Sequence, residues 1–274
     1  IFANGLIGVL TPASYISYNI LAMIMCLALI PLAVTLSKEP SLPKTKIFRP
    51  FLAYKISPLA SLGVVTAGIS TSAFGSIAPL YAANLGMSSL EISYFLTAAV
   101  IGGIIVHPPA GLLADRFDRR SVMMFFSILS TVVCLAIGSD LVEISGQGHG
   151  GSLLLALLFG VSTFPIYSLS AAHANDFAGP DDVLDLSASL IFFYALGAII
   201  SPIIAGYIIG RFGTPYLFIY ISFAHIFLMS FTVLRAIARP VSTDDKPYAY
   251  YPRTTMFIAN IIRGRNASDK RKKS

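Results

Sequence analysis

The sequence has no tryptophan, only two cysteines and few charged residues. Both cysteines, Cys26 and Cys134, lie in apolar stretches, which argues against a structural disulfide or a cysteine metal site. Charged residues make up 12% of the chain, against about 25% in soluble domains. The hydrophobic share is 55%, more than a soluble fold of 274 residues can bury. These values exclude a water-soluble enzyme, a disulfide-framed domain and a disordered chain.

Long apolar stretches occupy most of the chain instead. A bilayer core of about 30 Å needs about 20 apolar residues in a helix that rises about 1.5 Å per residue. We therefore predict an all-α membrane bundle with seven full transmembrane helices, at 15–36, 57–84, 89–113, 120–138, 152–172, 186–209 and 214–235. Residues 1–12 are typical of the last turns of a further, partial helix. Because the chain begins with Ile1 rather than Met, we expect a fragment.

The basic residues gather on one side of this predicted bundle. Counted with their flanking helix ends, four segments on that side hold 18 of the 19 Lys and Arg residues: 37–56, 114–119, 173–185 and the tail after 236. The other side holds Arg211 alone. Since cytoplasmic loops are enriched in basic residues, we expect this side to be cytoplasmic. The same bias accounts for the net charge of +6 without a nucleic-acid partner.

A short charged turn joins the third and fourth stretches, with the sequence Gly111-Leu-Leu-Ala-Asp115-Arg116-Phe-Asp118-Arg119-Arg120. Gly111 permits close approach of a neighbouring helix. Asp115 lies at a helix C-terminus, which is unfavourable unless the N-terminus of another helix faces it. We expect that helix to be 186–209, with Arg116 or Arg119 pairing with the carboxylate. The alternative is a plain basic loop that only sets topology.

This turn resembles the signature loop of the major facilitator superfamily, G-x-L-A-D-R-x-G-R-K. Arg120 takes the Lys position, and Asp118 replaces the second Gly, which can adopt a positive φ that Asp tolerates better than most residues. In that family the loop lies between helices 2 and 3, with a degenerate copy between helices 8 and 9. Within the family the pattern is similar to YcaD-like bacterial permeases.

The resemblance also implies a domain organisation, because a long basic linker joins the two six-helix halves in this family. Six predicted helices follow the long basic segment here. The implied parts are the end of an N-terminal half at 1–36, a cytoplasmic linker at 37–56, a C-terminal six-helix half at 57–236 and a cytoplasmic basic tail at 237–274. The remainder of the N-terminal half is then a missing partner of this chain.

In this family the substrate cavity is lined largely by helices 1, 4, 7 and 10, of which the last two correspond to 57–84 and 152–172. Polar and aromatic side chains near one face of each are the candidate cavity-lining residues: Thr66, Ser70, Phe74, Thr163 and Tyr167. Uncharged hydroxyls and aromatic rings suit a neutral or amphipathic solute. The alternative is that Ser and Thr only hydrogen-bond between helices, at about 0.6 kcal/mol each.

The 186–209 stretch combines small residues with a proline: Gly197, Ser201, Pro202 and Gly206. Small residues at four-residue spacing indicate a close-packing face, and Pro202 frees a backbone carbonyl and bends the helix. The pattern resembles the Gly-Pro-rich pattern found on helix 5 and, more loosely, on helix 11 of the family. It predicts tight packing, a hinge, or both.

Two histidines, His107 and His225, lie inside predicted helices, where ionisable side chains are functional hypotheses. Neither has a carboxylate partner within any predicted helix, and His173 is expected in a loop. The sequence shows no metal-binding spacing, nucleophile–base pair or phosphate-binding glycine loop. We therefore expect no cofactor, no metal and no enzymatic activity.

These observations favour a secondary transporter in the bacterial inner membrane. It would move a small solute across the bilayer by alternating access, which needs both six-helix halves. The alternative is a seven-helix receptor, because Asp115-Arg116-Phe117 is similar to the Asp-Arg-Tyr triplet of such receptors. Against it, tryptophan is absent, no Cys begins that helix, and the last helix lacks an Asn-Pro-x-x-Tyr pattern.

Overall fold

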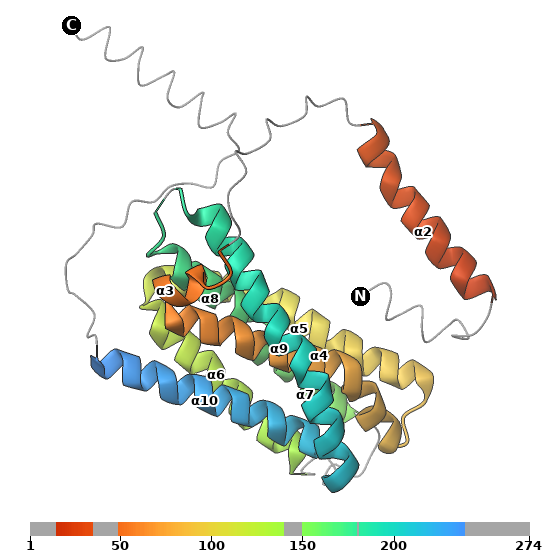
Figure 1. Cartoon of the computed structure of the whole chain (residues 1–274). Helices are drawn as coiled ribbons and strands as arrows, with labels where there is room; N and C mark the ends of the chain where they lie inside the picture. Colours follow the sequence, from red (N-terminus) through yellow and green to blue (C-terminus); the bar gives the residue numbers. More distant parts are fainter. Residues whose placement is uncertain (1–14, 35–48, 140–149, 180, 239–274) are drawn as a thin grey trace, which may run out of the picture. The chain divides into compact units, whose positions relative to one another are not determined.

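The computed structural model describes residues 15–34, 49–139, 150–179 and 181–238 (Figure 1). Within these ranges the regular elements are all helices: α2 (Tyr15–Val34), α3 (Leu52–Ile56), α4 (Pro58–Asn84), α5 (Ser89–Arg116), α6 (Arg119–Gly138), α7 (Gly150–Thr163), α8 (Pro165–Asn175), α9 (Val183–Phe212) and α10 (Tyr216–Ala238). The partial helix predicted at 1–12, linker residues 37–48 and the tail from 239 lie outside the described residues.

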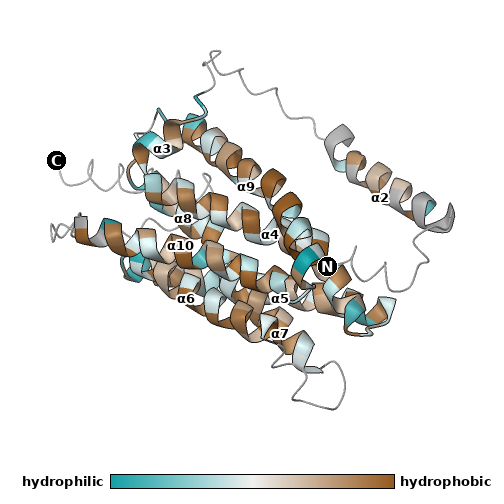
Figure 2. Ribbon diagram, turned by 60° about the horizontal axis from the view of Figure 1, so that its bottom comes forward, coloured by the Kyte–Doolittle hydropathy of each residue, from teal (hydrophilic) through white to brown (hydrophobic). Residues whose placement is uncertain are grey.

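Six spans in the described ranges are long and apolar enough to cross a membrane. They are α4, α5, α6, the α7–α8 pair, α9 and α10, which confirms the all-α membrane bundle and the six stretches after the linker. In Figure 2 hydrophobic positions run along these helices. Helix α2 coincides with the first stretch, but only Ala22–Pro31 within it qualifies, as a shorter apolar helix. The predicted count of seven full crossings is therefore not confirmed.

The helix boundaries follow from local chemistry. The Ser88 backbone N–H donates to Glu91 Oε2 (2.8 Å) and the Ser88 hydroxyl accepts from the Glu91 N–H, so a capping box begins α5. Pro165, which has no N–H, begins α8 and interrupts the 150–175 span. The turns after α4 and α9 use Gly86 and Gly213 at φ of 77° and 102°, where a side chain would be strained.

Helix α4 lies inside the bundle and packs against α9, α10 and α8 (Figure 1). The closest helix pairs meet through glycines that leave no room for a side chain. A Cβ on Gly68 would collide with the backbone carbonyl of Tyr194, and one on Gly160 with that of Ala99. Within a membrane the hydrophobic effect does not drive helices together. Close contact of the backbones at such small residues stabilises the helix pairs instead.

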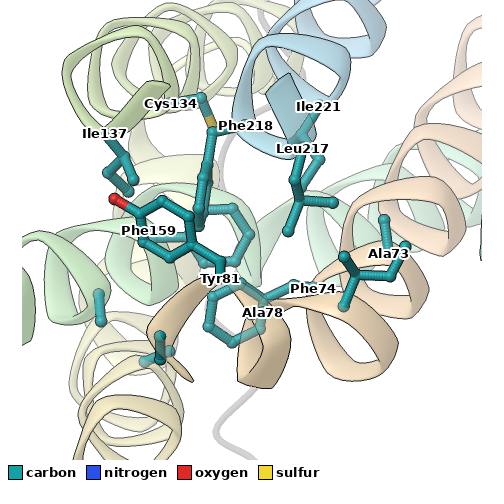
Figure 3. Close-up of a cluster of buried hydrophobic side chains, with 14 of the residues drawn as sticks. Ala73, Phe74, Ala78, Tyr81, Cys134, Ile137, Phe159, Leu217, Phe218 and Ile221 are labelled. Carbon is teal, nitrogen blue, oxygen red and sulfur yellow. The ribbon is translucent and has the colours of Figure 1, made fainter. Parts of the chain in front are cut away.

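Aromatic rings fill the core between α4, α6, α7 and α10 (Figure 3). The Phe74 ring stacks on Phe159 with centroids 4.4 Å apart, and Phe218 meets Tyr81 edge to face at 4.9 Å. All four side chains are almost fully buried. This cluster holds together helices that the short turns alone would not fix relative to one another.

Candidate functional site

The charged turn between α5 and α6 is tied to the end of α8. Arg119 lies 3.7 Å from Asp115 in its own turn, and its Nε is 3.0 Å from Asp176, the first residue after α8. One guanidinium therefore bridges two carboxylates from separate segments. Burial raises the pKa of Asp176, whereas the positive charge of Arg119 lowers it, so Arg119 favours the ionised form that this site would otherwise resist.

Asp115 forms a local ion pair, and its approach to the N-terminus of the 186–209 helix stays a prediction. Helix α9 is not among the main packing partners of α5, and the ion-pair partner of Asp115 is Arg119, one turn further along the chain. This pairing is one of the two that we expected. At Gly111 an added Cβ would meet nothing within 4 Å, so no described helix uses the close approach that this glycine permits. Arg116 is exposed and Arg120 is half-buried.

Asp118, which occupies a glycine position of the family signature, does not need a positive φ. Its φ is −57°, and its carboxylate accepts the backbone N–H of Arg120 at 3.3 Å. Asp118 is thus the N-cap of α6, one of the residue types preferred at such positions. The substitution exchanges a flexible turn residue for a helix-capping one.

The acidic residues at the start of α9 take their cation from the end of the linker. Arg49 contacts Asp182 at 2.9 Å and Asp185 at 2.8 Å. The hydrogen bond to Asp185 raises the pKa of the Arg49 guanidinium, because it stabilises the charged form. Sequence reasoning missed this pairing, since more than 130 residues separate the partners. The contacts place the linker end, the charged turn and residues 173–185 at one end of the bundle.

Around this ion pair, the linker end docks on α9 through polar and aromatic contacts. The Ser189 hydroxyl donates to the Pro50 carbonyl at 2.5 Å and accepts the Ala53 N–H at 2.9 Å. The Phe51 ring meets Phe192 and Phe193 edge to face, with centroids 6.1 and 6.2 Å apart. The residues just before α4 are therefore fixed to the first turns of α9.

Reversing the charge of Arg49 tests this dock. Arg49→Glu places a third carboxylate beside Asp182 and Asp185, so we expect amide hydrogen exchange in residues 183–190 of the full-length protein to become several-fold faster. Lys55→Glu makes the same charge reversal in α3 and is expected to leave the exchange of residues 183–190 unchanged. Arg49→Glu combined with Asp185→Arg should restore slow exchange. Unchanged exchange in Arg49→Glu alone would show that the ion pairs hold nothing in place.

Four of the five predicted cavity residues are buried inside the six-helix unit. Ser70 donates to the Thr66 carbonyl (2.9 Å) and contacts His225 Nε2 (3.1 Å), whereas Thr163 bonds to Ser130 (2.6 Å). Phe74 belongs to the aromatic core (Figure 3). In this arrangement Ser70 and Thr163 bond to neighbouring helices, and all four side chains present almost no surface to a solute. Tyr167 is the member of the set that stays partly exposed.

The polar surface that is accessible lies one residue further round α4. Thr71 bonds to the Tyr194 hydroxyl at 2.8 Å, and Tyr194 meets the Tyr167 ring edge to face with centroids 5.4 Å apart. These three side chains come from α4, α9 and α8 and are all partly exposed. Ser72 is also half-buried and donates to the Ala198 carbonyl at 2.7 Å. The sequence contained these hydroxyls, but its pattern does not fix the rotation of α4.

The small-residue stretch of α9 divides into a packed and an open part. A Cβ on Gly197 would meet the Val65 carbonyl, and Ser201 donates to the Ile69 carbonyl at 2.8 Å. Both residues therefore hold α9 against α4. Pro202 lies half-buried within a helix that continues from Val183 to Phe212, and an added Cβ on Gly206 would meet nothing within 4 Å.

The three described histidines lie in different surroundings. His225 is fully buried against Ser70, and His107 is exposed with its Nδ1 against the Gly103 carbonyl. His173 was expected in a loop, but it lies in α8 and is buried beside the Phe177 ring, because α8 continues to Asn175. Among the described residues no group of three or more His, Cys, Asp or Glu side chains gathers as metal ligands.

Comparison with known proteins gives consistent matches. The chain matches the Major Facilitator Superfamily over residues 60–264. It is 25% identical over 203 residues to an uncharacterized MFS-type transporter of Yersinia pestis (strain Pestoides F), covering 73% of this chain and 49% of that protein. It is 24% identical over 240 residues to the uncharacterized MFS-type transporter YcaD of Escherichia fergusonii, covering 85% and 58%. No solved structure matches the chain.

These matches decide between the hypotheses that the sequence left open. The chain spans about half the length of the curated relatives it matches. The similarity to YcaD is confirmed, and relatives described as transporters favour neither the seven-helix receptor nor an enzyme. With a family match over most of its length and six spans that can cross a bilayer, the chain is a multi-pass membrane protein and belongs to the Major Facilitator Superfamily.

Proposed function

We propose that this chain is the C-terminal half, with helix 6 and the linker, of a permease that moves a small solute by alternating access. The observation that carries the proposal is the partly exposed hydroxyl and aromatic surface of Thr71, Tyr194 and Tyr167 on otherwise apolar spans. Polar groups inside a membrane face protein or water rather than lipid. The missing N-terminal half is the partner that would close this surface into a cavity.

The chemistry of this surface favours an uncharged or amphipathic solute. Its polar groups are hydroxyls, and the Tyr167 and Tyr194 rings offer apolar faces beside them. A sugar, a polyol or an amphipathic molecule can hydrogen-bond to such groups and stack on the rings. Tyr167 is the predicted cavity residue that we retain in this surface. For Thr66, Ser70, Phe74 and Thr163 we propose contact with solute only after the helices have moved.

The charged turn is proposed as the latch of one conformation. Arg119 joins the α5–α6 turn to the end of α8 through Asp115 and Asp176. Such a bridge can form in one conformation and break in another, and about 1.4 kcal/mol shifts a two-state ratio about tenfold. Pro202 and the open Gly206 are proposed to let α9 bend when the latch changes.

Uptake into proteoliposomes tests the proposed function. The complete protein and residues 1–274 alone are each reconstituted and given a panel of radiolabelled sugars, polyols and amphipathic amines. We expect the complete protein to accumulate or exchange at least one of them above protein-free liposomes. Residues 1–274 alone are expected to move none, because one half-site cannot enclose a solute. Transport by 1–274 alone would contradict the two-half account, unless crosslinking finds a dimer.

Thiol labelling in intact cells tests the proposed orientation, with linker and C-terminus in the cytoplasm of a bacterial inner membrane. In a background free of Cys26 and Cys134, Ser139→Cys at the end of α6 should react with an impermeant maleimide, and Lys55→Cys should react only after permeabilisation. The reason is the bias of 18 in 19 basic residues toward the Lys55 side. The opposite labelling pattern would invert the topology.

A further inference from the structure

A polar side chain stands on an exposed face of α5 at membrane depth. His107 is exposed and lies nine residues before Arg116, which ends the helix, or about 13 Å along its axis. The 28 residues of α5 extend over about 42 Å, longer than the bilayer core of about 30 Å. Centred in the bilayer, α5 therefore places His107 within the hydrocarbon core.

The backbone fixes which nitrogen of His107 can take up a proton. Its Nδ1 contacts the carbonyl oxygen of Gly103, one turn earlier. Because a carbonyl only accepts, Nδ1 must carry the hydrogen and donate it. In the neutral ring, the lone pair is then on Nε2.

Two prolines leave two backbone carbonyls of α5 without their helical donors, one on the His107 side of the helix and one on nearly the opposite side. Pro108 and Pro109 follow His107 directly and have no N–H, so the carbonyls of Ile104 and Ile105 lose their regular helical donors. Both isoleucines are more than half exposed. At membrane depth, backbone groups without helical partners are tolerated where protein or water meets them, but not against lipid.

Water or the other half of the transporter therefore covers this face. Gly111, one turn beyond His107, is also exposed, with open space where a side chain would stand. His225 differs, because it is fully buried against Ser70 and has no exposed surface for exchange with water. Among the described histidines, His107 is the exposed one.

We propose that His107 binds and releases the proton that drives transport, with Nε2 as the proton-binding atom. The proposal rests on the alternating-access function above. In one conformation Nε2 takes a proton from water on one side of the membrane, which gives the imidazolium ion. In the other conformation the ring returns the proton to water on the opposite side. The Nδ1–H bond to Gly103 persists throughout, and the Ile104 carbonyl accepts from the water that delivers the proton.

No other titratable group near α5 matches this role. The titratable groups on the helices packed against α5 are Tyr81 on α4, Arg119, Arg120 and Cys134 on α6, and Tyr167 and His173 on α8; α5 itself adds Glu91, Tyr94, Asp115 and Arg116. Arg, Tyr and Cys side chains titrate well above neutral pH in water, whereas imidazole has an unperturbed pKa of about 6.5. The carboxylates of Glu91 and Asp115 lie near the two ends of α5, and His173 is buried.

Nuclear magnetic resonance tests proton binding without a known solute. The full-length protein, labelled with ¹⁵N-histidine, is titrated in lipid nanodiscs, and His107→Asn identifies the signal. This variant keeps a donor for the Gly103 carbonyl but removes Nε2. We expect the ring-nitrogen signals of His107 to shift reversibly as the pH is changed, because the proposal requires the ring to gain and lose a proton at Nε2. A ring that stays neutral from about pH 5 to 9 would overturn the proposal.

A gradient experiment then tests coupling, with the solute found in the uptake panel. In wild-type proteoliposomes an imposed pH gradient should drive accumulation, and a sodium gradient at constant pH should not. In the His107→Asn and His107→Gln variants, gradient-driven accumulation should fall at least tenfold, while solute exchange without a gradient continues. The His225→Asn variant should still accumulate solute in response to the pH gradient. Full gradient response in both His107 variants, or drive by sodium, would overturn the proposal. If the wild type moves no solute, the transport function fails, and the titration still decides whether His107 binds protons.

Discussion

Gly160→Leu is expected to prevent stable packing of the six-helix unit. Even a Cβ at this position would collide with the backbone carbonyl of Ala99, so α5 and α7 would have to separate. Backbone atoms cannot swing aside as the end of a flexible side chain can. Overpacking usually costs about 1–3 kcal/mol, and a rigid backbone contact puts this case at about 3 kcal/mol or more.

The free energy of unfolding of the full-length protein in detergent, measured by steric trapping, checks this expectation. Gly210→Leu is the matched control, because it makes the same exchange within α9, where an added Cβ meets nothing within 4 Å. We expect the control to stay within about 0.5 kcal/mol of the wild type, as for most surface substitutions. Equal stability of the Gly160 and Gly210 variants would mean that α5 and α7 do not pack as described.

Arg119→Glu is expected to cause the largest change in the transport cycle without unfolding the protein. It replaces the cation between Asp115 and Asp176 with a third carboxylate. Two like charges about 4 Å apart repel by about 1 kcal/mol in water and about 4 kcal/mol near a protein surface. The conformation that contains the bridge should therefore become at least tenfold rarer. Asp115→Asn should also make this conformation rarer, but by a smaller factor, because Arg119 keeps its ion pair with Asp176.

This change is measured as the rate of solute exchange by the complete protein, divided by the amount of that protein in the membrane. Arg211→Glu, at the other end of the bundle, makes the same charge change and should leave exchange near the wild-type rate. Arg119→Glu combined with Asp176→Arg restores opposite charges and should recover part of the rate. If Arg119→Glu transports normally, the turn is only a topology signal, which is the alternative that its basic composition allows.

Features that depend on neighbouring residues were predictable from the sequence. The apolar stretches after the linker, the Ser88–Glu91 capping box and the break at Pro165 all appear in the structure. Each follows from residues within one or two turns of one another. The ion-pair partner of Asp115 is also local, because Arg119 is four residues away.

Features that depend on tertiary packing were not predictable. The face of α4 that carries Thr66 and Ser70 is buried, whereas Thr71 and Ser72 on a neighbouring face are partly exposed. A rotation of about 100° per residue separates these faces, and a helix that is apolar all round gives no pattern from which to choose. The contact of Arg49 with α9 joins residues more than 130 positions apart, which no local pattern encodes.

Alternating access at α4 is the central claim, and thiol labelling of Ser72→Cys tests it most directly. Ser72 is half-buried and lies near the middle of α4, beside the hydroxyl surface. In the complete protein without Cys26 and Cys134, an impermeant maleimide should label Ser72→Cys in both right-side-out and inside-out vesicles. Ile128→Cys, on the outer face of α6, should react in neither. Labelling of Ser72→Cys from only one side, or from neither, would contradict a surface that opens alternately to the two faces of the membrane.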